Sequence, residues 1–230
     1  MHKIAVVVPK YGLLGGAEQF VAELTGRLAD QRSIRDTTRK EYGFSSQDPI
    51  ILFASMNFEI KGLDDILFSL AKLKAQNHKF KLIAADKENI KKYTKIANPI
   101  ISDIIFTGPL NKEHLIKMYL ASDLYIMLSK FDTFGMVVLE AMAAGVPVII
   151  SNNVGAKDLV QENKNGFIIN NTSDYDYVAT KIALLLDENI RRPFAAAAYQ
   201  TATLNTWDRV TTKYQDIYAD ILNAKTKEDL

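Results

Sequence analysis

Residues 131–155 hold the densest group of side chains that could do chemistry. A loop that follows an apolar run carries Asp132, and a helix is expected to begin near Gly135 and to contain Glu140. In parallel α/β sheets a loop of this kind lies at the carboxyl edge of the sheet, where ligands bind. The free N–H groups of residues 135–138 would attract a phosphate there. The Glu140 carboxylate could accept hydrogen bonds from a ribose diol, so the pattern favours a nucleotide site.

The same kinds of residue also allow purely structural interpretations. Asp132 could cap the helix N-terminus, and Glu140 could be a solvated helix residue. Lys61 could be a surface lysine at a helix start, although a cation there is slightly unfavourable and a bound pyrophosphate would reverse that. Gly15 and Gly16 could form a turn before a helix, or could let the backbone approach an anion. These glycines lack the spacing of a dinucleotide fingerprint.

Apolar, β-branched runs alternate with helical patterns along most of the chain. Strands are expected at Ile4–Val8, Ile50–Ala54, Phe80–Ala84, Ile104–Phe106, Leu124–Leu128, Val146–Ile150 and Phe167–Ile169. Helices are expected at Leu63–Leu73, Leu115–Ala121 and Val137–Ala144. Continuous apolar strands that alternate with helices indicate a parallel sheet covered on both faces. We therefore expect an α/β fold with a Rossmann-like doubly wound parallel sheet.

Other stretches of the chain differ from this alternating pattern. Residues 31–48 are polar and basic without a sustained apolar period, so they are expected to be a linker or a solvated helix rather than a membrane-binding patch. The C-terminal part shows three helical patterns and no strand, at about 174–187, 189–202 and 206–222. Trp207, Tyr214 and Tyr218 are expected to anchor the last helix to the body of the protein.

The composition is that of a soluble globular protein. The 230 residues are 48% hydrophobic and 24% charged, and the net charge of +1 gives no electrostatic attraction to nucleic acid. The absence of cysteine excludes disulfides and thiolate chemistry. No apolar run approaches the length of a membrane span, and the N-terminus does not read as a signal peptide. We expect a cytoplasmic protein, with contact at the inner face of the membrane left open.

The stretch around Asp132 and Glu140 also carries a family resemblance. Asp132-Thr133-Phe134-Gly135 and Leu139-Glu140-Ala141-Met142-Ala143-Ala144-Gly145-Val146-Pro147-Val148 resemble the E-x7-E signature of family-4 retaining glycosyltransferases, which have the two-lobed GT-B fold. Further motifs stand in the family's order: Gly15-Gly16-Ala17-Glu18, Lys61-Gly62, Phe106-Thr107-Gly108, Ala121-Ser122-Asp123, Gly155 with Asp158, and Asn165-Gly166-Phe167. Within the family the chain is most similar to lipopolysaccharide-core glucosyltransferases.

The resemblance implies a role for each matching residue. The catalytic residues would be Lys61, Asp132 and Glu140: the lysine would hold the donor diphosphate, Asp132 the donor sugar and Glu140 the ribose. The donor-binding set would be Gly15, Gly16, Lys61, Thr107, Gly108, Asp132, Phe134, Gly135, Met136, Val137 and Glu140. The reaction would transfer a glucose-like hexose from a nucleotide diphosphate, expected to be UDP, to a glycan or glycolipid such as lipopolysaccharide core. No metal and no cofactor are expected.

The resemblance also divides the chain into parts. Residues 1–30 would be a βα remnant of the acceptor lobe with the Gly-Gly loop, and residues 31–48 a linker. Residues 49–205 would be the Rossmann-like domain that binds the nucleotide sugar, and residues 206–230 a C-terminal helix. Most of the acceptor lobe of a GT-B enzyme is then missing, so a partner subunit could supply it.

The sequence departs from the family in three respects. Met56 or Ile60 lies where the family places an arginine, and Asp132 is one methylene shorter than the usual glutamate. The family's histidine near the reacting sugar has no match, since His78 and His114 are interpreted as surface residues and His2 lies at the start of the chain. These departures favour a second hypothesis, a donor-binding module or split-transferase subunit without independent catalysis. An unrelated Rossmann protein is the third alternative, and the lack of a dinucleotide loop counts against it.

Overall fold

The computed structural model describes residues 28–85 and 90–228, with side chains described from residue 31 to residue 221 outside the gap. Six parallel strands form one sheet in the order β3-β2-β1-β4-β5-β6. The strands are β1 (Ile50–Ala54), β2 (Lys81–Ala85), β3 (Ile104–Phe106), β4 (Leu124–Met127), β5 (Val148–Ser151) and β6 (Gly166–Ile169). The doubly wound α/β sheet and the strands expected within the described residues are confirmed. The strand expected at Ile4–Val8 lies outside them.

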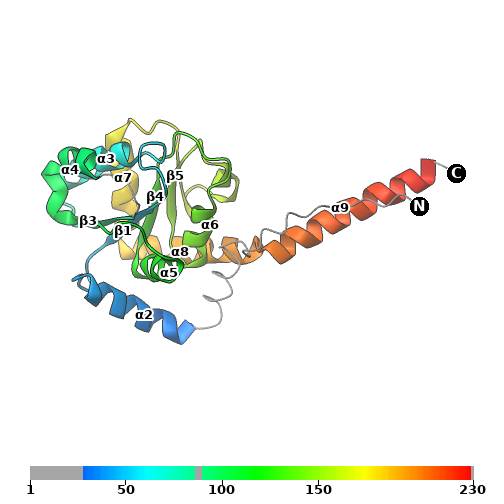
Figure 1. Cartoon of the computed structure of the whole chain (residues 1–230), viewed down its shortest axis with the longest axis horizontal. Helices are drawn as coiled ribbons and strands as arrows, with labels where there is room; N and C mark the ends of the chain where they lie inside the picture. The colour runs from blue at the N-terminus through cyan, green and yellow to red at the C-terminus, as the bar shows by residue number, and fades with distance from the viewer. Residues whose placement is uncertain (1–27, 86–89, 229–230) are drawn as a thin grey trace.

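Helices cover both faces of this sheet (Figure 1). The α-helices are α2 (Leu28–Glu41), α3 (Leu63–Ala75), α4 (Lys91–Ile96), α5 (Lys112–Ala121), α6 (Met136–Ala143), α7 (Tyr175–Leu186), α8 (Glu188–Leu204) and α9 (Trp207–Glu228). Two short 3₁₀ helices, η1 (Asn98–Asp103) and η2 (Gly155–Leu159), complete the described elements. The sequence did not predict α4 or η1.

Two hydrophobic clusters lie on opposite faces of the sheet, because successive strand residues point in opposite directions. In β1, Leu52 belongs to the cluster that packs against α5 and α6. Its neighbour Phe53 belongs to the cluster that packs against α3 and α7. Both side chains are fully buried, as the continuous apolar strand pattern predicts.

The strand order changes direction between β1 and β4, which are neighbours in the sheet. From β1 it moves outward through β2 to β3, and it then returns to add β4, β5 and β6 on the other side. The loops after β1 and after β4 therefore diverge at the carboxyl edge, and this switch point is where doubly wound folds bind ligands.

Of the two interpretations of residues 31–48, a linker or a solvated helix, the structure shows a helix over residues 31–41, which belong to α2. This helix packs against α5, and the guanidinium of Arg39 is buried between them. Burial lowers the pKa of Arg39, while the neighbouring Asp123 carboxylate raises it. The helix formed by this polar stretch is therefore held by buried ion pairs rather than by an apolar stripe, which is why apolar periodicity did not reveal how it packs.

The predicted anchoring of the last helix is also wrong. Trp207, Tyr214 and Tyr218 are 44%, 56% and 41% exposed. The helix α9 extends away from the body of the protein (Figure 1). Within the residues that the structure describes, no helix is long and apolar enough to cross a membrane.

Candidate functional site

The loop after β1 places Lys61 at the start of α3. The amide of Lys61 donates to the carbonyl of Asn57 at 3.1 Å, and the Asn57 side chain accepts the Ile60 amide at 2.9 Å. Gly62 follows with a φ of 78°, and a Cβ at this position would lie 2.0 Å from the carbonyl oxygen of Leu128. Only glycine fits such a backbone, so the Lys-Gly pair lets α3 begin directly against the end of β4.

The loop after β4 is bonded to the loop after β1. The amide of Lys130 donates to the carbonyl of Ile60 at 2.8 Å. The Ser129 hydroxyl lies 3.1 Å from that same carbonyl and 2.8 Å from the carbonyl of Phe131, so its single proton is shared between them. These contacts fix the two loops of the switch point relative to each other.

Lys61 and Asp132 meet at this point. The Nζ of Lys61 lies 2.6 Å from Oδ2 of Asp132, and the two side chains are 17% and 16% exposed. The same Nζ also lies 3.4 Å from the carbonyl of Phe131. The interpretation of Lys61 as an ordinary surface lysine is therefore wrong, because its side chain is largely buried and its ammonium is paired with a carboxylate.

Asp132 precedes the helix without capping it. Its Oδ1 accepts the amide of Phe134 at 3.2 Å, and the N-cap of α6 is Gly135. The backbone of Asp132 is also held, since its amide donates to Asn153 at 3.2 Å and its carbonyl accepts from Gly155 at 3.1 Å. The alternative in which Asp132 is the helix cap is therefore wrong.

Glycines allow the start of α6 to lie close to the neighbouring loop. Gly135 has a φ of 88°, and a Cβ there would lie 2.8 Å from the Val154 side chain. A Cβ on Gly155 would lie 2.1 Å from the Thr133 carbonyl. The amide of Val138 donates to Gly135 at 2.9 Å, so the prediction that residues 135–138 all offer free N–H groups is wrong for Val138. The preceding amides of the first turn retain the helix-start geometry that favours an anion.

Glu140 lies one turn into α6 and is bonded to α5. The hydroxyl of Tyr119, which is fully buried, lies 3.1 Å from Oε2 of Glu140 and 3.3 Å from the carbonyl of Val137. Burial raises the pKa of Glu140, and the hydrogen bond from Tyr119 and the charge of Lys112 lower it. Glu140 is thus partly buried rather than fully solvated. Tyr119 was missed from the sequence because it reaches Glu140 only through the packing of two helices.

The remaining predicted site residues are distributed along the same edge. Thr107 and Gly108 follow β3, whereas Lys61 follows β1, two positions further along the sheet. Gly108 has a φ of 71° with open space where a Cβ would stand. Met136 and Val137 form the first turn of α6 and are half-buried. Gly15 and Gly16 lie outside the described residues.

Exposed apolar side chains surround the Lys61–Asp132 pair. Met56 is 81% exposed and Ile60 43%, and neither side chain carries the positive charge that the resemblance leads one to expect there. Phe131 and Phe134 in the opposite loop are also exposed. His78 and His114 are exposed, as predicted, and His114 lies near the start of α5 beside Asn111.

This geometry combines one ammonium, two carboxylates and a helix N-terminus at a switch point. The helix start and Lys61 can hold an anion, and Glu140 can accept hydrogen bonds from a diol. An anion that binds Lys61 must compete with Asp132 for its ammonium, since that carboxylate already lies at hydrogen-bond distance. The arrangement suits a nucleotide diphosphate at the carboxyl edge of the sheet.

Comparison with known proteins agrees with this architecture. Residues 34–201 match the family of Glycosyl transferases group 1. The chain is 28% identical over 193 residues to N-acetyl-alpha-D-glucosaminyl L-malate synthase of Bacillus anthracis, covering 82% of this chain and 50% of that protein. The crystal structure of WaaG, a glycosyltransferase involved in lipopolysaccharide biosynthesis, superimposes with a TM-score of 0.70 at 22% identity, covering 80% of this chain and 50% of WaaG.

A second solved structure, Anabaena Alr3699/HepE in complex with UDP and glucose, gives a TM-score of 0.66 at 22% identity, with 82% of this chain and 52% of that one covered. These likenesses assign the fold as that of the C-terminal lobe of a GT-B glycosyltransferase. The chain belongs to the Glycosyl transferases group 1 family. It spans about half the length of the curated relative described above.

Proposed function

We propose that this chain provides the donor-binding lobe of a retaining glycosyltransferase. The observation that carries the proposal is the Lys61–Asp132 pair, held at 2.6 Å where the loops after β1 and β4 diverge and beside the N-terminus of α6. An ammonium in this position can stabilise the charge that develops on a departing diphosphate.

Each residue of the site has a proposed role. Lys61 and the first turn of α6 hold the donor diphosphate. Glu140, oriented by Tyr119, binds the ribose hydroxyls. Asp132 leaves Lys61 when the diphosphate binds and then orients the donor sugar. Thr107 and Gly108 lie at the same edge, at the end of β3, and contact the nucleobase.

We propose a UDP-linked, glucose-like hexose as the donor and a glycan or glycolipid as the acceptor. The complex of Alr3699/HepE with UDP and glucose supports the donor. The role of WaaG in lipopolysaccharide biosynthesis supports lipopolysaccharide core as an example of the acceptor. With a glycolipid acceptor, we propose that the reaction takes place in the cytoplasm at the inner face of the membrane.

A transfer assay with radiolabelled donor tests this function. UDP-hexoses and GDP-hexoses are offered in turn with a glycolipid acceptor mixture, and label in the lipid fraction is counted. We expect label from one donor and none when Lys61 is replaced by methionine, because the diphosphate then loses its ammonium. Absence of turnover with every donor and acceptor would contradict catalysis by this chain.

A second candidate function is a donor-binding module that acts with a partner subunit. It is favoured by the length of the chain, about half that of the curated relative described above, and by the uncharged side chains of Met56 and Ile60 at the site. The two candidates differ in one result. A module binds UDP in a calorimeter and shows no transfer alone, whereas the enzyme shows both.

A further inference from the structure

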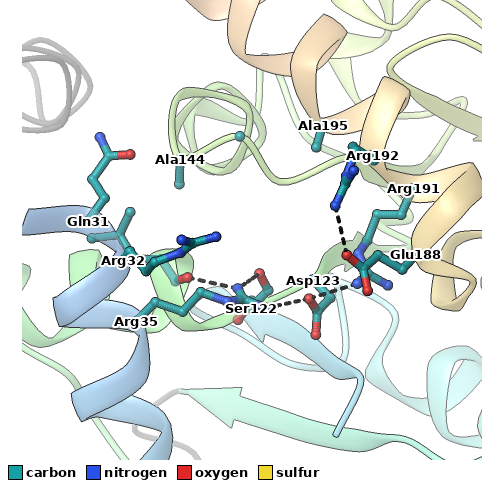
Figure 2. Close-up of a pocket in the computed structure, with 12 residues that line it drawn as sticks. Gln31, Arg32, Arg35, Ser122, Asp123, Ala144, Glu188, Arg191, Arg192 and Ala195 are labelled. Atoms are coloured by element: carbon teal, nitrogen blue, oxygen red, sulfur yellow. Dashed lines mark hydrogen bonds and ion pairs between the residues drawn. The ribbon is translucent and has the colours of Figure 1, made fainter. Parts of the chain in front are cut away.

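A cavity lies at the amino edge of the sheet, opposite the switch point. Its volume is about 390 Å³, within the range of ligand sites in proteins. Asp123 immediately before β4 and Gly145 shortly before β5 form its floor, and α2 and α8 form two of its walls (Figure 2). Lys61 follows β1 and Asp132 follows β4, at the carboxyl edge of the same sheet, so this cavity and the Lys61–Asp132 pair lie at opposite edges of the sheet.

Arginine dominates the lining of this cavity. Arg32 and Arg35 come from α2, and Arg191 and Arg192 come from α8. The lining contains two carboxylates, those of Asp123 and Glu188. Four positive charges against two negative charges leave the cavity with a net charge of +2, so an anion is the favoured occupant.

Two of the arginines are fixed in the walls. Arg35 donates to the carbonyls of Leu120 and Ser122 at 3.0 and 2.8 Å, and it lies 2.6 Å from Asp123. Arg191 donates to two carbonyls at the end of α7 and lies 3.3 Å from the same Asp123 carboxylate. Their positions are set by the fold, so they form a rigid positive wall.

The other two arginines can turn toward a ligand. Arg192 is 81% exposed, and its ion pair is with Glu188 one turn earlier on α8, at 3.3 Å. Exposed pairs of this kind contribute little to stability, so a stronger anion can displace Glu188. Arg32 makes no ion pair within the described part of the chain. Figure 2 shows Arg32 and Arg192 extending from opposite sides toward the open space between α2 and α8.

Small residues keep this space open. Ala144, Gly145 and Ala195 line the side of the cavity that lies between the end of α6 and α8. A Cβ on Gly145, which has a φ of 70°, would stand 4.0 Å from the carbonyl of Ala195. Larger side chains here would fill the volume between the arginines.

We propose that this cavity binds a phosphate ester, held between the guanidinium groups of Arg32 and Arg192. A guanidinium presents a planar pair of donors that matches two phosphate oxygens, and two of them from opposite walls clamp one phosphate. The bound phosphate ties α2 to α8, two helices that the Asp123 ion pairs already connect. The phosphate comes either from a soluble phosphorylated molecule or from a lipid headgroup.

Titration with inorganic phosphate, followed by amide chemical shifts of the labelled full chain, tests this site. We expect saturable shifts at Gly145 and Ala195. The double variant Arg32→Gln/Arg192→Gln should bind phosphate about tenfold more weakly, because two charge-assisted contacts are lost. Arg209→Gln, an exposed arginine on α9, is the matched control and should bind like the natural chain.

Superimposable spectra of the unliganded variants establish that they are folded. Shifts confined to the neighbourhood of Gly135, or equal binding by the natural chain and the double variant, would overturn the proposal. Vesicles of phosphatidylcholine with phosphatidylglycerol identify the source of the phosphate. Sedimentation of the natural chain but not of the double variant with these vesicles supports a headgroup, whereas phosphate binding without sedimentation supports a soluble ligand.

Discussion

The pKa of the Glu140 carboxyl group is shifted in opposite directions by its surroundings. Burial raises its pKa, and the hydrogen bond from Tyr119 and the charge of Lys112 lower it, with burial the largest cause and the net shift upward. The folded protein therefore binds the Glu140 proton more tightly than the unfolded chain does. This contribution to stability is present at low pH and is lost as pH rises through the raised pKa. The ionised Glu140 carboxylate thus destabilises the unliganded protein at neutral pH.

Replacing Glu140 by glutamine separates the effect of its ionisation on stability from its proposed contribution to ligand binding. Glu140→Gln removes the buried ionisation, so we expect the free energy of unfolding to rise by about 1 kcal/mol at pH 7 and to change little near pH 4. Urea denaturation at both pH values measures this difference. The same variant should bind UDP more weakly. An equal change in stability at the two pH values would contradict the assignment of the effect to ionisation.

At the residue scale, the family resemblance predicted Lys61, Asp132 and Glu140 as one site, and the structure places the first two in direct contact. The sequence did not predict that the Asp132 carboxylate would form an ion pair with the Lys61 ammonium. That contact depends on how two loops from separate strands approach each other. The role of Tyr119 was missed for the same reason, because a fully buried tyrosine on α5 gives no local signal of its partner on α6.

At the scale of elements, the junction between the loop after β1 and α3 depends on Gly62. Gly62→Ala places a Cβ in a backbone with positive φ and 2.0 Å from the Leu128 carbonyl. We expect a loss of about 3 kcal/mol in the free energy of unfolding. Gly108→Ala is the matched control, because its φ of 71° is similar and the space around it is open. This control should lose about 1 kcal/mol. Equal losses in urea denaturation would show that the close approach is not the cause.

The amino edge of the sheet is held by Asp123. Its carboxylate lies within 2.6, 2.8 and 3.3 Å of Arg35, Arg39 and Arg191, and it accepts the Ile50 amide at 2.8 Å. This one side chain therefore connects α2, β1 and α8 at the start of β4.

Asp123→Asn should lower the free energy of unfolding by about 3–5 kcal/mol, because the buried guanidinium of Arg39 loses its counter-charge. Asp176→Asn removes an exposed ion pair with Lys72 and should change stability by less than about 0.5 kcal/mol. Thermal or urea unfolding of both variants measures the contrast. A loss for Asp123→Asn as small as that of the control would mean that the network does not hold the helices.

Elements with a regular apolar pattern could be predicted from the sequence. The packing of an element held by ion pairs was less predictable. Strands such as β1 and β5 are buried on both faces, and a continuous apolar run identifies them directly. The helix α2 buries polar side chains, those of Thr38 and Arg39, which an apolar pattern does not identify. Its packing becomes apparent only when Asp123, more than eighty residues later, is brought beside it.

At the scale of the whole molecule, α9 extends beyond the body of the protein (Figure 1). The sequence pattern of α9 predicted a helix correctly and its docking wrongly. Apolar periodicity defines a face that can pack, and it does not identify the surface that the face meets. Trp207 is 44% exposed and Ile221 48% exposed, so the apolar face is uncovered along the described side chains of α9.

Removal of residues 206–230 should leave the stability of the body nearly unchanged. The described side chains of α9 are mostly exposed, so little buried apolar area is lost. We expect the unfolding midpoint in scanning calorimetry to shift by less than about 2 °C. A fall of about 5 °C or more would show that α9 packs against the body in solution.

The central claim is that Lys61 holds the diphosphate of a nucleotide-sugar donor, and UDP binding tests it most directly. Isothermal calorimetry compares the natural chain with Lys61→Met and with Lys72→Met, an exposed lysine on α3, the helix that follows Lys61. We predict saturable binding by the natural chain, binding weakened about tenfold or more in Lys61→Met, and unchanged binding in Lys72→Met. Equal affinities in all three proteins, or no saturable binding of UDP or GDP by the natural chain, would contradict the account.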